Sequence, residues 1–309
     1  MAVHSRSQGH GAGYARKWDI PYAYNDLDAL LSDNLIDAVY VSTTNERHHE
    51  ATIAAASAGK HVLCEKPLAL NLDDATSMVE TCREAGVVLG TNHGRRNDAS
   101  VRAAQELVRS GRLGTLLSAR TSNCTELPER LRGWRLTDVS AGAGAVLDLA
   151  VHEADTLRFV LADEPGEVTA FTGSHGLSSA GVEDSVMGLL KMESGLLASF
   201  ACSFATPCGE VGFELHGSKA SLFARRRLGQ DPIVWVRSPG DEEVIRAASA
   251  EPIGHATVRA FEAAVRGEGS PTASGEDGLR SLAVALGVAE SAVSGRAVSL
   301  NPPEMSSCR

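Results

Sequence analysis

Residues 59–68 read Gly59-Lys60-His61-Val62-Leu63-Cys64-Glu65-Lys66-Pro67-Leu68. The apolar centre of this stretch, 61–64, predicts a short buried strand, and Gly59 closes the helix predicted over 48–58. Glu65 and Lys66 come directly after this strand. Ligands of open parallel sheets bind just beyond the carboxyl ends of the strands. The stretch therefore predicts a parallel sheet with a charged pair at its ligand-binding edge.

The sequence on either side repeats this arrangement. Strands are predicted over 37–42 and 87–90, and a helix over 72–85. Polar residues follow the two strands, namely Thr43-Thr44-Asn45 and Thr91-Asn92-His93. Short apolar strands that alternate with helices are typical of β-α-β units. We therefore predict an α/β unit with a parallel sheet over residues 1–93.

The pattern changes from residue 94 onward. The predicted helices cover 99–110, 146–161, 255–266 and 277–294. The predicted strands cover 116–122, 167–172, 184–192, 196–204, 210–216 and 233–237. Strands that follow one another with turn signals between them favour hairpins. We therefore predict an α+β unit over residues 94–309 with a large, mostly antiparallel open sheet.

Composition limits the possible partners. The 309 residues carry a formal net charge of -10, which argues against nucleic acid and anionic membranes as partners. The one basic run, 225–227, is interpreted as a solvated loop. No apolar stretch has the length of a membrane span or of a signal peptide, so a cytoplasmic protein is expected. The six cysteines form no C-x-x-C pair, which favours reduced thiols without a redox role.

Three residues are candidates for catalysis. Lys66, at a strand end, can polarise a carbonyl group, and the Lys66-Pro67 bond is a candidate for the cis form. Asp148 and His152 lie four residues apart in a predicted helix, so their side chains are expected on one face. A carboxylate there would orient the imidazole and raise its pKa, as a general acid/base requires. The alternative is a buried, structural histidine. A metal site formed with Asp155 lacks further His or Cys ligands, and no metal is expected.

The N-terminal segment suggests which nicotinamide cofactor is used. Gly9-His10-Gly11-Ala12-Gly13 looks like a phosphate loop, yet no strand precedes it as the dinucleotide fingerprint requires. Residues 1–4 are better interpreted as the end of a strand beside the adenosine ribose. Ser5, Arg6 and His10 then stand where an NAD enzyme would present a carboxylate, and they suit the 2′-phosphate of NADP. A solvated polar turn is the alternative, and NAD remains possible.

Trp134 and Arg135 precede a segment rich in glycine and alanine. They are candidates for a stacking and charge contact with a nucleotide. A core tryptophan beside a surface arginine fits the sequence equally well.

Taken together, three motifs resemble those of the Gfo/Idh/MocA oxidoreductases. They are Thr43-Thr44-Asn45-Glu46-x-His48, the stretch 59–68, and Leu147-Asp148-x-x-x-His152-x-x-Asp155. The resemblance implies a Rossmann-type nucleotide-binding domain joined to an α+β domain, with the active site in the cleft between them. It implies catalytic roles for Lys66, Asp148 and His152. The positions that it implies for the cofactor are Ser5, Arg6, His10, Thr43, Thr44, Asn45, His48, Glu65, Lys66, Asn92, Trp134 and Arg135.

Further motifs, such as Gly90-Thr91-Asn92-His93 and Gly133-Trp134-Arg135-Leu136, resemble NADP-dependent sugar reductases of this family. The resemblance implies hydride transfer between NADP(H) and a sugar or polyol carbon, and a possible homo-oligomer formed through the C-terminal sheet. Another sugar or inositol dehydrogenase, or a non-catalytic ligand-binding protein, is the alternative. Members of the family carry a first strand, a small-residue turn and a helix before the point at which this sequence starts. We expect about thirty such residues upstream of Met1, and weak cofactor binding without them.

Overall fold

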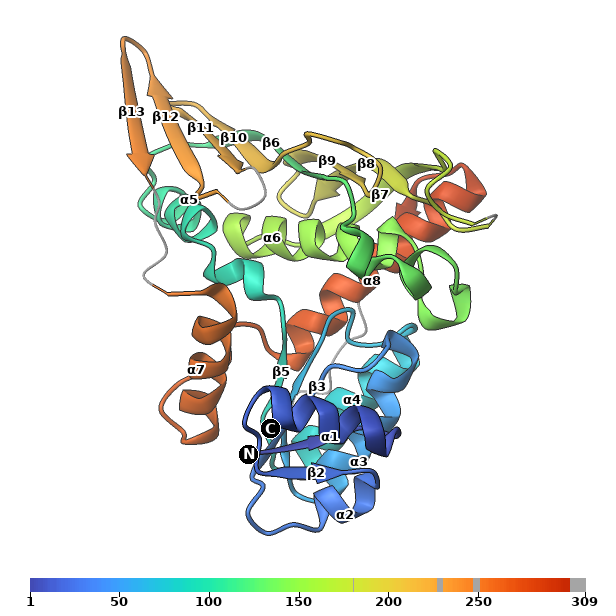
Figure 1. Cartoon of the computed structure of the whole chain (residues 1–309). Coiled ribbons are helices and arrows are strands. Elements are labelled where there is room, and N and C mark those ends of the chain that lie inside the picture. Colours follow the sequence, from blue (N-terminus) through green and yellow to red (C-terminus); the bar gives the residue numbers. More distant parts are fainter. Residues whose placement is uncertain (180, 227–229, 247–250, 301–309) are drawn as a thin grey trace.

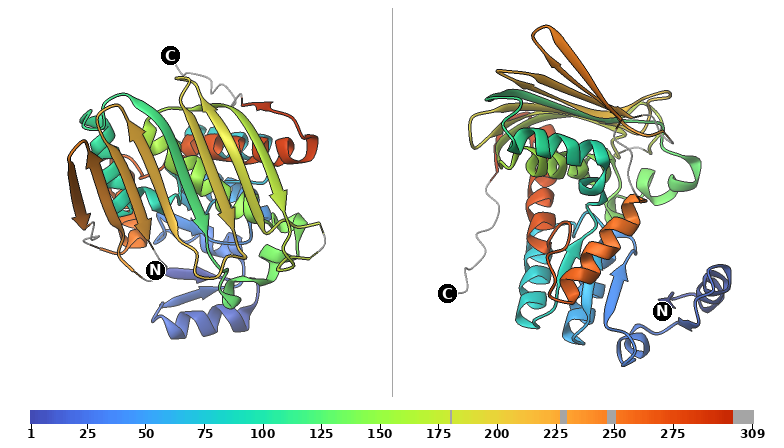
Figure 2. Two further views of the ribbon diagram at one scale, coloured as in Figure 1. Left: turned by 90° about the horizontal axis from the view of Figure 1, so that it is seen from above. Right: turned by 90° about the vertical axis from the view of Figure 1, so that its left-hand side faces the viewer.

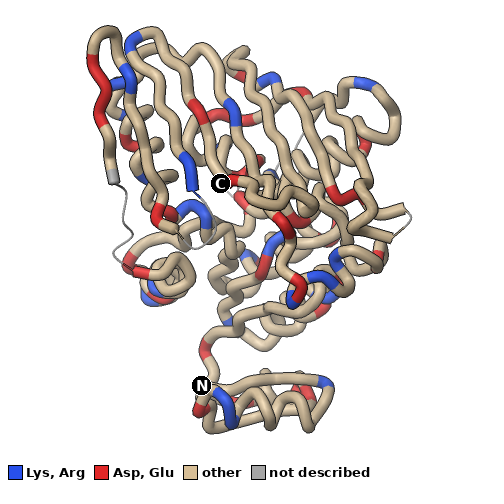
Figure 3. The backbone as a smooth tube through the Cα atoms, turned by 45° about the horizontal axis from the view of Figure 1, so that its top comes forward, with Lys and Arg blue, Asp and Glu red and all other residues tan. Residues whose placement is uncertain are grey.

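The structure is a computed structural model, and it describes residues 1–179, 181–226, 230–246 and 251–300. A large sheet lies at the top of the molecule, helices α5, α6 and α8 lie beneath it, and the N-terminal α/β part lies below them (Figure 1). None of the described helices is long and apolar enough to cross a membrane. Acidic and basic residues are interspersed along the chain (Figure 3).

The N-terminal part contains a three-stranded parallel sheet in the order β3-β4-β5. Val62 and Cys64 of the central strand β4 are completely buried, which explains its unbroken apolar sequence. The strands are β3 (Ala38–Val41), β4 (His61–Cys64) and β5 (Leu89–Thr91). The helices are α3 (His48–Ser57), preceded by the 3-10 turn η1 (Asn45–Arg47), and α4 (Leu72–Glu84). The predicted β-α-β pattern is present.

The first residues form a separate two-stranded parallel sheet of β1 (Ala2–His4) and β2 (Tyr22–Tyr24). Among the described residues, no strand pairing joins β1 to β3. Helix α1 (Gln8–Lys17) lies between β1 and β2 in sequence and α2 (Leu27–Leu31) follows them. Figure 2 shows α1 standing apart from the rest of the N-terminal part. The sequence did not predict β2 and α2, because three and five residues are too few for a periodicity.

The second sheet has nine strands in the order β13-β12-β11-β10-β6-β9-β8-β7-β14. Every pairing is antiparallel except that of β6 with β9. The strands are β6 (Leu116–Cys124), β7 (Pro165–Gly173), β8 (Ser185–Met192), β9 (Leu197–Ser203), β10 (Val211–Gly217), β11 (Ser221–Arg226), β12 (Ile233–Ser238), β13 (Asp241–Arg246) and β14 (Val298–Ser299). The predicted fold class, an α/β part plus an α+β part with a large and mostly antiparallel sheet, is confirmed.

One face of this sheet is covered by helices and the opposite face is open (Figure 2). The covering helices are α5 (Ala99–Arg109), after the short turn η2 (Gly94–Asn97), α6 (Val151–Leu161) and α8 (Gly275–Ser294), and α7 (Ile253–Val265) lies beside η2. Four more short turns precede α6, namely η3 (Glu129–Leu131), η4 (Gly133–Leu136), η5 (Val139–Ala141) and the π-helical η6 (Val146–Ala150).

The basic run was wrongly interpreted as a loop. Arg225 and Arg226 lie in strand β11, and Arg227 is outside the described residues. Arg225 pairs with Glu214 on the neighbouring strand, and Arg226 Nη1 lies 3.0 Å from Asp98 Oδ2. Cross-strand acidic partners let charged residues occupy a strand, which charge pattern alone does not reveal.

Helix α8 contributes to both parts of the molecule. Leu279 and Leu282 are buried in the same core as Val62 and Met78 of the N-terminal part. Its first turn also lies against β5, since a Cβ added to Gly278 would come within 2.3 Å of Thr91 Oγ1. The close packing of α8 fixes the strand ends of the small sheet relative to α6, which carries the predicted acid/base residue.

Candidate active site

The carboxyl ends of β3, β4 and β5 bring several predicted cofactor residues together. Asn92 Nδ2, after β5, donates to Glu65 Oε1, after β4, at 2.8 Å. Tyr40 of β3 hydrogen-bonds to the same carboxylate. Thr43 and Thr44 follow β3, with Thr43 exposed and Thr44 half-buried. This edge presents hydroxyl, amide and carboxylate groups, a set of groups that suits a nucleotide.

Two predicted residues are built into the loops of this edge. His48 is completely buried, and its Nδ1 lies 2.8 Å from the carbonyl oxygen of Pro67. Its Nε2 lies 3.3 Å from the carbonyl oxygen of Thr43. Burial lowers the pKa of His48, so the ring is neutral near pH 7. Asn45 is also buried and donates to the carbonyl oxygen of Gly142 at 3.5 Å. The side chains of His48 and Asn45 hold the loops around Thr43 and Thr44.

Lys66 and Asp148 form a buried ion pair. Lys66 Nζ lies 2.6 Å from Asp148 Oδ1 and also donates to the carbonyl oxygen of Asp148 at 2.8 Å. Each side chain is only 12% exposed. Burial alone would raise the pKa of Asp148, but Lys66 and Arg135 outweigh it and the pKa is lowered. Asp148 is therefore ionised near neutral pH. The bond between Lys66 and Pro67 is cis.

The predicted pairing of Asp148 with His152 needs correction. Asp148 lies in the π-helical turn η6, whereas His152 lies in the first turn of α6. A π turn is wider than an α turn, so the α-helical spacing rule does not hold across it. Asp148 instead contacts Lys66 and Arg135. The pKa of His152 is lowered well below 6.5, first by burial and then by Lys66, Arg95 and His93, rather than raised. The ring is therefore neutral near pH 7.

Trp134 and Arg135 lie beside this ion pair. The guanidinium of Arg135 stacks on the Trp134 ring at 4.5 Å from its centroid. Arg135 Nε also lies 3.6 Å from Asp148 Oδ2. Asp148 is therefore flanked by two cations, and Trp134 and Arg135 stack on each other beside it. The contact of this pair with a nucleotide stays a prediction.

His93 was not predicted as a site residue. Its side chain is 1% exposed, and its ring meets the ring of His152 edge to face with 6.2 Å between the centroids. Sequence offers one signal, because His93 follows the predicted strand that ends at the ligand-binding edge. A histidine in that position looks the same in sequence whether it is structural or functional.

Ser5, Arg6 and His10 gather at the end of β1 and the start of α1. Ser5 Oγ lies 3.2 Å from His10 Nδ1, and Ser7 caps the helix by accepting from the His10 backbone N–H. Arg6 is exposed. The first turn of α1 contains no acidic residue. A helix N-terminus with hydroxyl, imidazole and guanidinium groups suits a phosphate better than a ribose hydroxyl pair.

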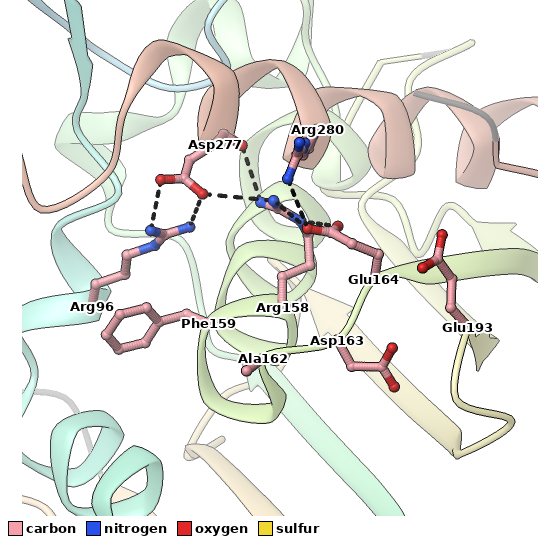
Figure 4. A pocket seen from close by; sticks show the side chains of 9 residues that line it. All are labelled: Arg96, Arg158, Phe159, Ala162, Asp163, Glu164, Glu193, Asp277 and Arg280. Carbon is pink, nitrogen blue, oxygen red and sulfur yellow. Dashed lines mark hydrogen bonds and ion pairs between the residues drawn. The ribbon is translucent and has the colours of Figure 1, made fainter. Parts of the chain in front are cut away.

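A pocket of about 300 Å³ lies away from these residues, and none of the predicted site residues lines it. Figure 4 shows that the arginines of the pocket face two of its acidic side chains, Asp277 and Glu164. Arg158 pairs with Glu164, and Arg96 pairs with Asp277. Arg96 also donates to both carboxylate oxygens of Asp155, which is part of this network. The network joins η2, α6 and α8.

Two family models match the chain. The model described as "Oxidoreductase family, NAD-binding Rossmann fold" matches residues 1–93, and the model described as "GFO/IDH/MocA C-terminal domain" matches residues 101–223. Together they account for most of the sequence.

Individual relatives agree with these matches. The chain is 45% identical to 1,5-anhydro-D-fructose reductase of Ensifer adhaerens, over 97% of this chain and 90% of that protein. It is 30% identical to myo-inositol 2-dehydrogenase of Thermotoga maritima, over 92% and 86% of the two chains. The crystal structure of aldose-aldose oxidoreductase from Caulobacter crescentus, complexed with glycerol, superposes with a TM-score of 0.87 at 26% identity, over 97% of this chain and 91% of that chain. The chain therefore belongs to the Gfo/Idh/MocA family of oxidoreductases, whose nucleotide-binding domain has the NAD-binding Rossmann fold.

Proposed function

We propose that this oxidoreductase reduces 1,5-anhydro-D-fructose to 1,5-anhydro-D-mannitol with NADPH. Residues 1–93 would bind the cofactor, and residues 94–309 would supply most of the sugar-binding surface. The 45% identity to a 1,5-anhydro-D-fructose reductase over nearly the whole chain supports this substrate. Fold alone does not determine substrate, so the site residues must support the proposed chemistry.

The geometry of Lys66 is the observation that supports carbonyl chemistry best. An ammonium group has three N–H donors, and Lys66 directs two of them to the carboxylate and the carbonyl oxygen of Asp148. The third donor is left for a substrate oxygen. Asp148 holds the ammonium in place, so little reorganisation is needed when negative charge develops on that oxygen.

His152 is proposed to exchange the proton. A bound nicotinamide supplies or accepts the hydride. The neutral ring is suited to remove a proton from an alcohol in the oxidation direction. In the reduction direction, negative charge that develops on the substrate oxygen favours the protonated ring, which then donates to the nascent alkoxide. Lys66 stabilises the same oxygen, and Asp148 keeps the lysine oriented.

NADP is proposed over NAD because of the residues at the start of α1. Ser5, Arg6 and His10 offer hydrogen-bond donors and positive charge, and no carboxylate stands in the first turn to bind the ribose hydroxyls. Thr43, Thr44, Glu65, Asn92, Trp134 and Arg135 would line the rest of the cofactor site, with Asn45 and His48 supporting its loops.

We also propose a homo-oligomer formed through the open face of the large sheet. Phe171, Met187, Leu189 and Leu197 are each more than 60% exposed. The strand register places them together, since Phe171 pairs with Met187. A contiguous exposed apolar patch of this kind is typical of a protein interface. Sedimentation of the wild-type protein and of Met187→Asp compares their oligomeric states, since the variant places a charge on that patch.

The function is tested by incubating the protein with NADPH and 1,5-anhydro-D-fructose, following NADPH absorbance and identifying the product by NMR. The expected result is NADPH oxidation with formation of 1,5-anhydro-D-mannitol. Myo-inositol and D-xylose, assayed with NADP⁺, serve as competing substrates. A tenfold higher kcat/KM for either competitor would contradict the proposed substrate. Formation of the other epimer, 1,5-anhydro-D-glucitol, would contradict the proposed stereochemistry.

A further inference from the structure

His93 is a buried polar residue with no satisfied nitrogen. It lies between strand β5 and the turn η2, and its side chain is 1% exposed. Neither Nδ1 nor Nε2 has a hydrogen-bond partner. Buried polar groups without partners are rare, because each one loses its hydration without compensation. The ring needs an explanation beyond packing.

A second unsatisfied nitrogen lies on the ring next to it. Nδ1 of His152 is buried and also has no partner, while the His152 ring meets His93 at 82°. Nδ1 of His93 also lies 3.7 Å from Asp155 Oδ2. The three side chains therefore form a row from Asp155 through His93 to His152, with unmet hydrogen-bonding capacity at each imidazole.

The neighbours of the two rings favour one arrangement of the protons. The carboxylate of Asp155 favours the proton of His93 on Nδ1, the nitrogen that lies nearest to it. A neutral His93 then has a lone pair on Nε2. A hydrogen bond from His152 to that lone pair would need the His152 proton on Nδ1, and Nε2 of His152 would keep a lone pair for the substrate.

We propose that His93 is a positioning residue that holds His152 in the Nδ1–H tautomer, through a hydrogen bond made directly or through one water. This inference deepens the proposed function and rests on His152 as the proton-exchanging residue. When His152 takes a proton from an alcohol, the proton arrives at Nε2, and Nδ1–H continues to donate to His93. His93 and Asp155 neither gain nor lose a proton during turnover.

Other charges face the two rings. Lys66, Arg95 and His93 act on His152. Asp155, Arg96, Arg158 and Asp277 act on His93, and burial lowers its pKa to about 4. A neutral His93 near pH 7 agrees with the acceptor role. The mutual pairing of Arg96 with Asp155 and Asp277 limits the net charge at His93.

Substitution of His93 tests the role by kinetics. His93→Phe keeps a ring and removes both nitrogens, whereas the carbonyl oxygen of His93→Gln can replace Nε2 as the acceptor. We expect His93→Phe to lower kcat by about tenfold to a hundredfold with substrate KM within about threefold, and to move the acid limb of the pH profile. His93→Gln should recover activity to within about fivefold of wild type.

His61→Gln is the matched control. His61 lies on β4, and its Nδ1 accepts from the Val88 backbone N–H at 2.9 Å, so its role is structural. This variant should change stability and leave the pH profile of the folded enzyme unaltered. The inference is wrong if His93→Phe keeps the wild-type pH profile and loses activity only in proportion to unfolded protein.

A measurement on the wild-type enzyme covers the case in which the His93 variants do not fold. Long-range ¹H–¹⁵N NMR of ¹⁵N-histidine-labelled protein distinguishes the two neutral tautomers of His152. The Nδ1–H form is expected, and the Nε2–H form would overturn the inference. This readout does not depend on turnover. If the proposed function fails because no sugar is reduced, the tautomer is still decided separately.

Discussion

Lys66 Nζ lies 2.6 Å from Asp148 Oδ1, although the two residues are 82 positions apart in the sequence. The lysine belongs to the strand-end motif of the nucleotide-binding part, and the aspartate belongs to a π-helical turn that leads into α6. The pair therefore links the N-terminal part of the molecule to the turn that leads into α6. A catalytic ammonium needs such a partner, because an unpaired charge in this buried position would be costly.

Asp148→Asn should weaken both stability and turnover. The amide leaves Lys66 and Arg135 without a negative partner in a buried position. We expect a loss of about 3 kcal/mol in the free energy of unfolding, and about a tenfold to hundredfold loss in kcat. The measurement is urea unfolding beside steady-state kinetics. In the double variant with Lys66→Met, the two losses should be less than additive, and full additivity would show that the residues act separately.

Much of the fold is readable from local sequence, because strand period and helix stops are local properties. The strand at 61–64 and the residues after it, Glu65 and Lys66, follow directly from the apolar run and the strand-end rule. The identity of the residue that pairs with Lys66 does not follow from the local sequence. The π turn at 146–150 shifts the helical phase between Asp148 and His152, and a regular 3.6-residue period does not reveal that shift.

The second gap between sequence and structure concerns tertiary contacts. The sequence does not show whether His93 is structural or functional, whereas the fold places its ring against that of His152. Likewise, nothing local shows that Leu279 and Leu282 of α8 complete the core of the N-terminal part. Such relationships depend on which elements pack together, and sequence periodicity reports only which face of an element is buried.

Gly144→Ala should be unusually destabilising. Gly144 has φ +110°, and an added Cβ would lie 2.1 Å from Glu183 Oε1, an atom that accepts from the Val146 backbone N–H at 3.0 Å. The substitution would displace Glu183 from the start of the turn that carries Asp148. Gly176→Ala is the matched control, since Gly176 also has a positive φ but open space around it. We expect Gly144→Ala to cost about 2 kcal/mol more than the control in unfolding free energy. Equal losses would mean that backbone strain alone matters.

Stability should fall with acid partly because of His93. Burial lowers its pKa from 6.5 to about 4, so the unfolded chain binds a proton before the folded chain does. The contribution of the neutral ring to the free energy of unfolding is complete above 6.5, the pKa of His93 in the unfolded chain. This contribution is lost as the pH falls from 6.5 toward 4. Between about pH 7 and about pH 4.5, the free energy of unfolding of the wild-type protein should fall by about 2 kcal/mol more than that of His93→Phe. Urea unfolding at both pH values measures this, and parallel losses in the two proteins would contradict the neutral buried ring.

Arg6→Asp should shift cofactor preference from NADPH toward NADH. The new carboxylate would repel a 2′-phosphate and accept hydrogen bonds from ribose hydroxyls. We expect the ratio of kcat/KM for NADPH to that for NADH to fall by about tenfold or more. Arg16→Asp is the control, because Arg16 is exposed in the last turn of the same helix. An equal effect of both substitutions would point to general electrostatics, and equal use of both cofactors by wild type would contradict the choice of NADP.

Lys66 is proposed to act on the charge that develops on the substrate oxygen. The test is the turnover of Lys66→Met, measured per folded molecule and beside a titration of cofactor affinity. We expect a loss in kcat of about a hundredfold or more with cofactor affinity within a few-fold of wild type, because the ammonium stabilises the transition state rather than the bound ground state. Turnover within about threefold of wild type in a merely destabilised variant would remove Lys66 from the mechanism.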